Sequence, residues 1–143
     1  MNIHLMKPGK IFFSAVIFAT TFFVACAPEE EPAPADARDL YVDSWTLNEN
    51  STQIGVSPPY TIHINKVTTN TTQVEIENFY NIGFNFKAKV NIDGSSMTIP
   101  QQTYNGNQLH GSGTKTNANS INMTYYVNNG STIDTCTATL TRQ

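Results

Sequence analysis

Turn signals recur at nearly even intervals through residues 40–143, and this spacing limits the chain to short antiparallel strands. Their centres lie about twelve residues apart, and an Asx-Gly pair between alternating apolar residues is a strong hairpin signal. The signals are Asn70, Asn81-Ile82-Gly83, Asp93-Gly94, Asn105-Gly106, Asn117-Ala118 and Asn129-Gly130. Six such turns join seven strands. Residues 40–47 add an eighth strand, which the longer loop 48–59 joins to the rest.

Composition agrees with this pattern, because the polar residues are mostly Thr and Asn. The chain has 19 Thr and 16 Asn, and only 13% of its residues are charged. Thr favours the pleated surface of a sheet and Asn favours turns. The composition excludes a charged coiled coil, a basic nucleic-acid binder and a multi-domain enzyme. No 3.6-residue periodicity is found after the first 25 residues.

Pairing the strands across each turn tests the register. Across Asn81-Ile82-Gly83, two opposite-charge pairs and two apolar pairs face each other: Glu75 with Lys89, Glu77 with Lys87, Val74 with Val90, and Ile76 with Ala88. The other predicted pairs are Met123 with Cys136, Ile121 with Ala138, Gly111 with Tyr125, Gly113 with Met123, and His63 beside Glu75. In the hairpin at Asn105-Gly106, the inward faces of the two strands match only if a bulge intervenes. The bulge is predicted at Pro100, because proline lacks a backbone donor.

The register defines one apolar face. The residues predicted to point inward are Ile62, Ile64, Val74, Ile76, Phe84, Phe86, Val90, Ile92, Met97, Ile99, Leu109, Ile121, Met123, Tyr125, Val127, Cys136 and Leu140. We therefore predict an all-β fold, an eight-stranded antiparallel up-and-down meander over residues 40–143. The meander is expected to close into a barrel, which removes sheet edges, with a two-sheet sandwich as the alternative. Large inward side chains on short strands predict a filled interior.

The first 25 residues are typical of a signal peptide. Lys7 and Lys10 precede an uncharged stretch, Ile11 to Ala25. That stretch is too short to cross a hydrocarbon core of ~30 Å. It ends in Phe23-Val24-Ala25-Cys26, which resembles the bacterial lipoprotein box and implies a lipid on Cys26. The alternative is an ordinary secretory signal followed by an incidental cysteine.

Residues 26–39 are predicted to be an acidic, proline-rich tether, because this composition cannot bury apolar surface. From residue 26 on, the chain has 11 acidic and 6 basic side chains, whereas residues 40–143 have 6 and 5. The tether therefore carries nearly all the net negative charge. A solvated linker explains this, but an acidic run after the lipidated cysteine also resembles the surface-export signal of Bacteroidota lipoproteins. We expect a lipid anchor in the outer membrane with the domain exposed at the cell surface.

Three further segments carry a family resemblance. Asp43-Ser44-Trp45, Thr98-Ile99-Pro100-Gln101 and Gly111-Ser112-Gly113, together with the order strand, long loop, meander, resemble small lipocalin-like lipoproteins of the Bacteroidota. Asp43 stands where lipocalins proper carry glycine. The resemblance implies a barrel, and it transfers no site residues.

Six side chains are candidate ligand or contact residues, each with a structural alternative. Trp45 either closes the core or forms a ligand platform. Phe79, Tyr80 and Ile82 either plug one end of the barrel or form an exposed contact patch. Asp134 is expected to point inward opposite Tyr125 near a rim, as a hydrogen-bonded carboxylate or as a polar anchor in a ligand pocket. Binding is expected at a rim or at loops, with segments 48–59 and 79–84 favoured.

No catalytic signature, cofactor motif or metal-ligand spacing is present in the sequence. Cys136 is expected to be a buried thiol without a disulfide partner. The five scattered bases of residues 40–143 exclude a nucleic-acid footprint. The sequence therefore predicts a tethered non-enzymatic module that binds a small ligand, a glycan or a protein. The alternative is a structural or accessory lipoprotein of an envelope assembly.

Overall fold

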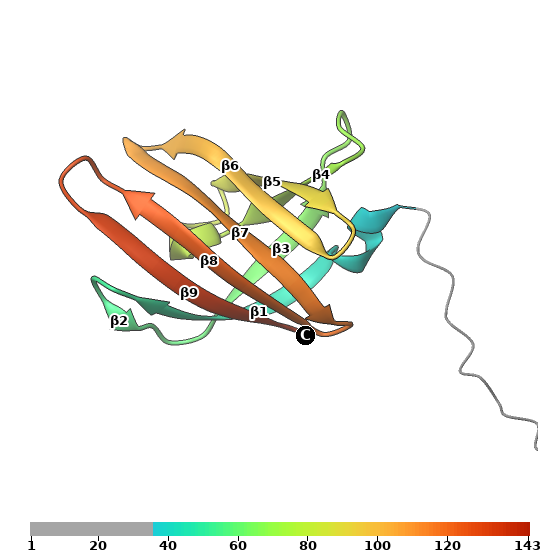
Figure 1. Ribbon diagram of the computed structural model, residues 1–143, viewed down its shortest axis with the longest axis horizontal. Coiled ribbons are helices and arrows are strands. Elements are labelled where there is room, and N and C mark those ends of the chain that lie inside the picture. Colours follow the sequence, from blue (N-terminus) through green and yellow to red (C-terminus); the bar gives the residue numbers. More distant parts are fainter. Residues whose placement is uncertain (1–35) are drawn as a thin grey trace, which may run out of the picture. The chain divides into compact units, whose positions relative to one another are not determined.

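The computed structural model describes residues 36–143, which form an antiparallel β-barrel (Figure 1). The predictions for residues 1–35, the signal peptide, Cys26 and most of the tether, lie outside this range. The described chain has the 3-10 helices η1 (Ala37–Leu40) and η2 (Phe79–Asn81). Its strands are β1 (Asp43–Ser51), β2 (Gly55–Val56), β3 (Tyr60–Lys66), β4 (Gln73–Glu77), β5 (Lys87–Asp93), β6 (Ser96–Tyr104), β7 (Asn107–Asn117), β8 (Ser120–Asn128) and β9 (Ile133–Arg142).

The barrel closes because β1 pairs with β3 on one side and with the last strand, β9, on the other. Leu47 lies opposite Tyr60 of β3 on one side and opposite Leu140 of β9 on the other. From β3 to β9 each strand pairs with the next, so eight strands form a closed antiparallel meander. The short β2 adds a ribbon on the end of β1, where Asn50 pairs with Val56. The predicted barrel is confirmed over the sandwich.

The first strand is displaced from its predicted position. It begins at Asp43 instead of residue 40 and continues to Ser51, through part of the predicted 48–59 loop. Residues 48–51 are part of the strand because each of them pairs with a residue of β9, as far as Ser51 opposite Cys136. Residues 36–39, assigned to the tether, belong to the folded domain, since Asp36 caps η1.

The β4–β5 register matches the prediction at all four predicted pairs. Its charges are distributed differently: Lys87 Nζ lies 2.6 Å from Glu75 and 2.9 Å from Glu77, and Lys89 contributes no ion pair in the described chain. Gly111 and Gly113 lie opposite Tyr125 and Met123, as expected.

Two predicted registers are wrong by two residues, which leaves each side chain on its predicted face. Tyr125 pairs with Cys136 and Met123 with Ala138, because the β8–β9 turn is wider than two residues. In that turn the Asn129 side chain accepts hydrogen bonds from the amides of Ser131 and Thr132. His63 lies opposite Glu77 instead of Glu75, and its Nδ1 is 2.9 Å from Ser44 Oγ.

The predicted bulge is present between Ile99 and Gln102, next to Pro100. At the bulge β6 separates from β5, so the backbone N–H and C=O of Lys89 in β5 no longer face a backbone partner. The Gln102 carboxamide takes that partner's place. Its Oε1 accepts from the Lys89 amide at 2.9 Å, and its Nε2 donates to the Lys89 carbonyl at 2.9 Å. One side chain thus takes the place of a missing peptide group.

Apolar side chains fill the interior. Every residue predicted to point inward is buried except Phe84, which is 50% exposed. Phe84 lies in the loop after η2, outside the strand alternation that the prediction extended to it. The core also contains Tyr41, Trp45, Leu47, Phe79, Ala88 and Ala138, which the predicted set omits.

The N-terminal segment seals one end of the barrel, which we call the closed end. Buried Arg38 donates to the carbonyls of Val67 and Asn70 in the β3–β4 loop, at 2.9 and 2.7 Å. The Tyr41 hydroxyl donates to the Gly94 carbonyl in the β5–β6 turn. At the same end the Arg142 guanidinium lies 4.6 Å above the ring of Trp45.

We expect the two strand glycines of β7 to be needed for close packing. A Cβ on Gly111 would lie 2.5 Å from Tyr125 Cβ and 2.6 Å from the Thr124 carbonyl oxygen, neither of which can move away easily. Gly111→Ala should therefore lower the free energy of unfolding by about 3 kcal/mol, measured by chemical denaturation. Gly113→Ala should cost less, because its close contacts are longer, at 2.8 to 2.9 Å, and two of the three belong to methionine side chains. Equal stability of Gly111→Ala and the wild type would contradict the close approach of β7 and β8.

Candidate ligand site at the open end of the barrel

The opposite end of the barrel, which we call the open end, is formed by the loops around residues 52–54, 78–86, 105–106 and 129–132. The 78–86 loop folds inward, so that Phe79 is fully buried with its ring 4.5 Å from that of Tyr125. Tyr80 meets the same Tyr125 ring edge-on at 6.2 Å. Three of the six candidate residues therefore lie together, and Phe79 takes the predicted role of a plug.

The backbone of this loop is strained. Asn78, Tyr80 and Asn81 all have left-handed φ values, of 59, 55 and 53°. A left-handed residue costs roughly 1–2 kcal/mol, less for Asn, whose side chain can bond locally. The Asn78 side chain offsets part of that cost by donating to the Thr61 carbonyl and accepting from the Gly83 amide. This conformation turns the Tyr80 hydroxyl toward Asp134.

Asp134 is buried and accepts hydrogen bonds from several neutral donors. The hydroxyls of Ser51 and Tyr80 donate to one carboxylate oxygen at 2.7 and 2.8 Å. The Thr52 hydroxyl and the Gln53 amide donate to the other at 3.1 Å each. Burial raises the pKa of Asp134, but these hydrogen bonds outweigh it and hold the pKa at about 2. Asp134 is therefore a carboxylate at neutral pH.

The position of Asp134 differs in one respect from the prediction. It points inward near the rim, as expected, but it lies opposite Val127 because of the two-residue register difference in β8–β9. Its bond to a tyrosine hydroxyl comes from Tyr80, where the sequence suggested Tyr125.

A second carboxylate, Glu49, lies below Asp134 in the interior. It is 5% exposed and accepts hydrogen bonds from the hydroxyls of Tyr60, at 2.8 Å, and Tyr125. Burial raises the pKa of both tyrosines, so each hydroxyl remains a donor at neutral pH. Burial also raises the pKa of the neighbouring Cys136 thiol, to about 12, which keeps it unreactive.

No cation balances these two carboxylates within the described chain. The ion pairs among residues 36–143 involve Asp36, Asp39, Asp43, Glu75 and Glu77, and neither Glu49 nor Asp134 takes part. The interior of the open end is therefore an acidic environment that only neutral hydrogen-bond donors stabilise.

A pocket of about 370 Å³ opens beside Asp134. Its lining combines the Tyr80 ring and two aliphatic side chains with amides and hydroxyls: Gln53, Ile54, Tyr80, Asn107, Val127, Asn129, Thr132 and Asp134. This mixture of apolar surface and a few placed polar groups is typical of small-molecule sites. The pocket includes residues from both segments favoured by the sequence, 48–59 and 79–84.

The remaining candidates lie elsewhere. Trp45 is fully buried at the closed end, where its indole N–H donates to the Tyr41 carbonyl at 2.8 Å, so its position corresponds to core closure. Ile82 is 36% exposed and does not line the pocket. Sequence reasoning missed Glu49, although the alternation Trp45, Leu47, Glu49, Ser51 places it on the inward face.

Among residues 36–143, no helix is long and apolar enough to span a bilayer, and no cluster of His, Cys, Asp and Glu could hold a metal ion.

Comparison with known proteins supports the fold alone. No protein-family model and no curated protein matches the chain. Among solved structures, a redesigned β-barrel, b11L5F_LGL, is similar with a TM-score of 0.55 and 18% identity, over 76% of this chain and 96% of that one. The structure of EF1p2_mFAP2b bound to DFHBI is similar with a TM-score of 0.54 and 13% identity, over 76% and 98% of the two chains.

The hydrogen bonds to Asp134 predict a pH-dependent contribution to stability. Its pKa is lower in the folded chain than in the unfolded chain, so the stabilisation is present above about pH 4 and is lost as the pH falls toward 2. The stability difference between wild type and Asp134→Asn should therefore shrink by about 2 kcal/mol between pH 6 and pH 2 in denaturant titrations. Asp93→Asn, at an exposed carboxylate of the closed end, is the matched control. A difference that does not change with pH would contradict the assignment.

Proposed function

We propose that the protein is a lipid-anchored, non-enzymatic binding module that holds a small organic ligand at the open end of its barrel. The observation that supports this most directly is the 370 Å³ pocket beside Asp134. One end of the barrel is sealed by Arg38 and Tyr41, whereas the other retains this hollow above a buried carboxylate. The interior below is filled, so the site is a shallow one at the rim.

The charge in the pocket favours a ligand with a positively charged or hydrogen-bond-donating group. Asp134 presents negative charge that no cation neutralises within residues 36–143. Several basic side chains lie at the closed end, where Arg142 and Lys115 contact the Trp45 ring and Lys66 pairs with Asp36. An amine could approach Asp134 and the face of Tyr80, a favourable arrangement for a cation. Ile54 and Val127 would contact the apolar part of such a ligand.

The anchor would present this end away from the membrane. The described chain enters the barrel at the closed end, where Asp36 caps η1. A lipid on Cys26, ten residues earlier in the sequence, would therefore hold the closed end toward the bilayer. Display on the outer surface of the outer membrane is part of the proposal, since the acidic residues after Cys26 resemble an export signal.

Ligand binding can be tested with the full chain purified in detergent. A panel of small organic amines with apolar bodies, alongside carboxylates of the same size, should raise the thermal midpoint only with the amines. Ile54 is 69% exposed on the rim, so Ile54→Ala should remove ligand contact without disturbing the core. We expect it to weaken binding about tenfold, measured by calorimetry.

Ile82→Ala is the matched control, because Ile82 is an exposed isoleucine of the same end outside the pocket lining. Equal loss of affinity in both variants, or a preference for carboxylates, would contradict the site. Absence of any ligand, together with a stable envelope protein that copurifies, would favour the accessory alternative.

Lipidation makes a separate prediction. Wild-type protein should partition into the membrane fraction and carry a lipid mass on Cys26, whereas Cys26→Ser should be released as soluble protein. Mass spectrometry of the mature N-terminus and membrane fractionation measure both effects. An unmodified Cys26, or equal fractionation of the two proteins, would contradict the anchor. Cys136→Ser controls for loss of a thiol, since Cys136 is buried in the barrel.

A further inference from the structure

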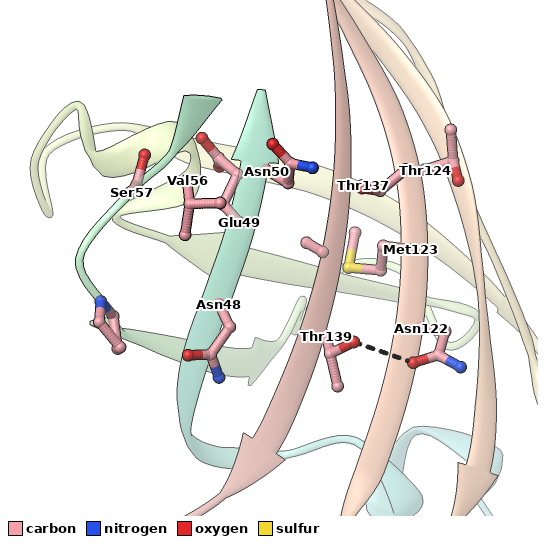
Figure 2. Close-up of a pocket in the computed structure, with 12 residues that line it drawn as sticks. Asn48, Glu49, Asn50, Val56, Ser57, Asn122, Met123, Thr124, Thr137 and Thr139 are labelled. Carbon is pink, nitrogen blue, oxygen red and sulfur yellow. Dashed lines mark hydrogen bonds between the residues drawn. The ribbon is translucent and has the colours of Figure 1, made fainter. Parts of the chain in front are cut away.

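The outer wall of the barrel carries a second hollow, distinct from the open end, which we call the outer groove. It has a volume of about 560 Å³ and lies over β1, β9 and β8. Figure 2 shows Val56 and Ser57 on one side of it and Asn122 and Thr139 on the other, with Asn48 and Asn50 between them. Pro59 also lines the groove. The groove is thus bordered by an apolar ridge and a polar sheet.

The polar surface consists of two cross-strand rows of hydroxyls and amides. In one row Asn48, Thr139 and Asn122 lie side by side; in the other, Asn50, Thr137 and Thr124. Both rows continue onto β7, through Thr114 and Ser112. Because neighbouring strands lie ~4.8 Å apart, four strands place regularly spaced hydrogen-bonding groups along roughly 14 Å.

Two smaller hollows extend the outer groove along the same wall. One, of about 230 Å³, shares Asn122, Met123 and Thr124 with it and reaches Ser112 and Thr114. The other, of about 340 Å³, shares Asn50 and Thr137 with it and reaches Thr135. Such a continuous depression fits an extended ligand better than a compact one.

The exposed side chains of this wall carry no charge. The rows contain only Asn, Ser and Thr, and the one acidic residue of the lining, Glu49, is buried with its carboxylate bonded to tyrosines in the interior. The wall formed by β4 and β5, in contrast, presents Glu75, Glu77 and Lys87. Of these two walls, the β4–β5 wall carries exposed charge and the wall of the outer groove carries none.

We infer that the outer groove binds a neutral oligosaccharide chain. Amides and hydroxyls can both donate to and accept from sugar hydroxyls. Val56, 81% exposed, and Pro59 offer an apolar ridge for the C–H face of a pyranose ring. A charged polymer would find no counter-charge here. A peptide could not add as a strand to β8 or β9, which form the floor of the groove, because both are paired on both sides.

The test uses the full chain in detergent and native gels that contain a neutral glucan, mannan, galactan or xylan. Polygalacturonate and a sulfated glycosaminoglycan serve as charged comparators. We expect at least one neutral polymer to retard the protein and the charged ones to leave it unaffected. The double variant Thr124→Val, Thr137→Val removes two hydroxyls and keeps β-branched side chains, so it should fold and bind about tenfold more weakly.

Thr103→Val is the matched control, because Thr103 is an exposed strand threonine outside the groove lining, and its binding should equal that of the wild type. The inference is overturned if no neutral polymer binds, if charged polymers bind equally, or if the double variant retains full affinity. Ile54→Ala, at the open end, should leave glycan binding unchanged, so failure of one site is distinguishable from failure of the other. Concentration-dependent dimerisation abolished by the double variant would instead assign the face to a second copy of the chain.

Discussion

The pairing of the first strand with the last is the constraint on which the rest of the barrel depends. Trp45 lies opposite Arg142 in that pairing, and the Arg142 guanidinium covers the indole while donating to the carbonyls of Leu40 and Val42. The Arg142 side chain thus links the β1–β9 pairing, which we call the seam, to the core and to the segment that follows η1. Because the seam closes the sheet, all inward side chains share one interior. Phe79 must then enter from a loop to fill the end that the strands leave open.

Closure of the barrel also places its ion-paired cations, its buried carboxylates and its neutral polar side chains in separate regions. At the closed end, cations contact Trp45 and pair with Asp36, Asp39 and Asp43. At the open end, Glu49 and Asp134 receive only neutral donors. The outer groove carries neither sign of charge. A single small domain therefore combines an acidic pocket at the open end with a neutral groove on its outer wall.

Local spacing in the sequence predicts a large part of the fold. The Asx turns, the Glu75 and Glu77 pairings, the glycines opposite Tyr125 and Met123, and the bulge at Pro100 all follow from alternation and turn chemistry. The features that sequence reasoning misses depend on contacts remote in sequence. Glu49 falls in a predicted loop because the strand that contains it pairs along residues 48–51 with β9, at the other end of the domain sequence. Arg38 folds back because the distant carbonyls of Val67 and Asn70 accept its hydrogen bonds. The β8–β9 register is the exception, because local bonds from the Ser131 and Thr132 amides to the Asn129 side chain widen that turn. The candidate site is partly predictable, since Phe79, Tyr80, Tyr125 and Asp134 are all sequence candidates, but their convergence requires the closed barrel.

The β1–β9 seam has a consequence for the order of events during synthesis and folding. Partners in β1 and β9 stand at opposite ends of the domain sequence, so the contact that completes the sheet has high contact order, a property of slow-folding topologies. Until β9 has been synthesised, β1 lacks the partner that closes the barrel. Neighbouring hairpins can form as they are synthesised, but the closed wall cannot be completed before β9 is free to pair with β1.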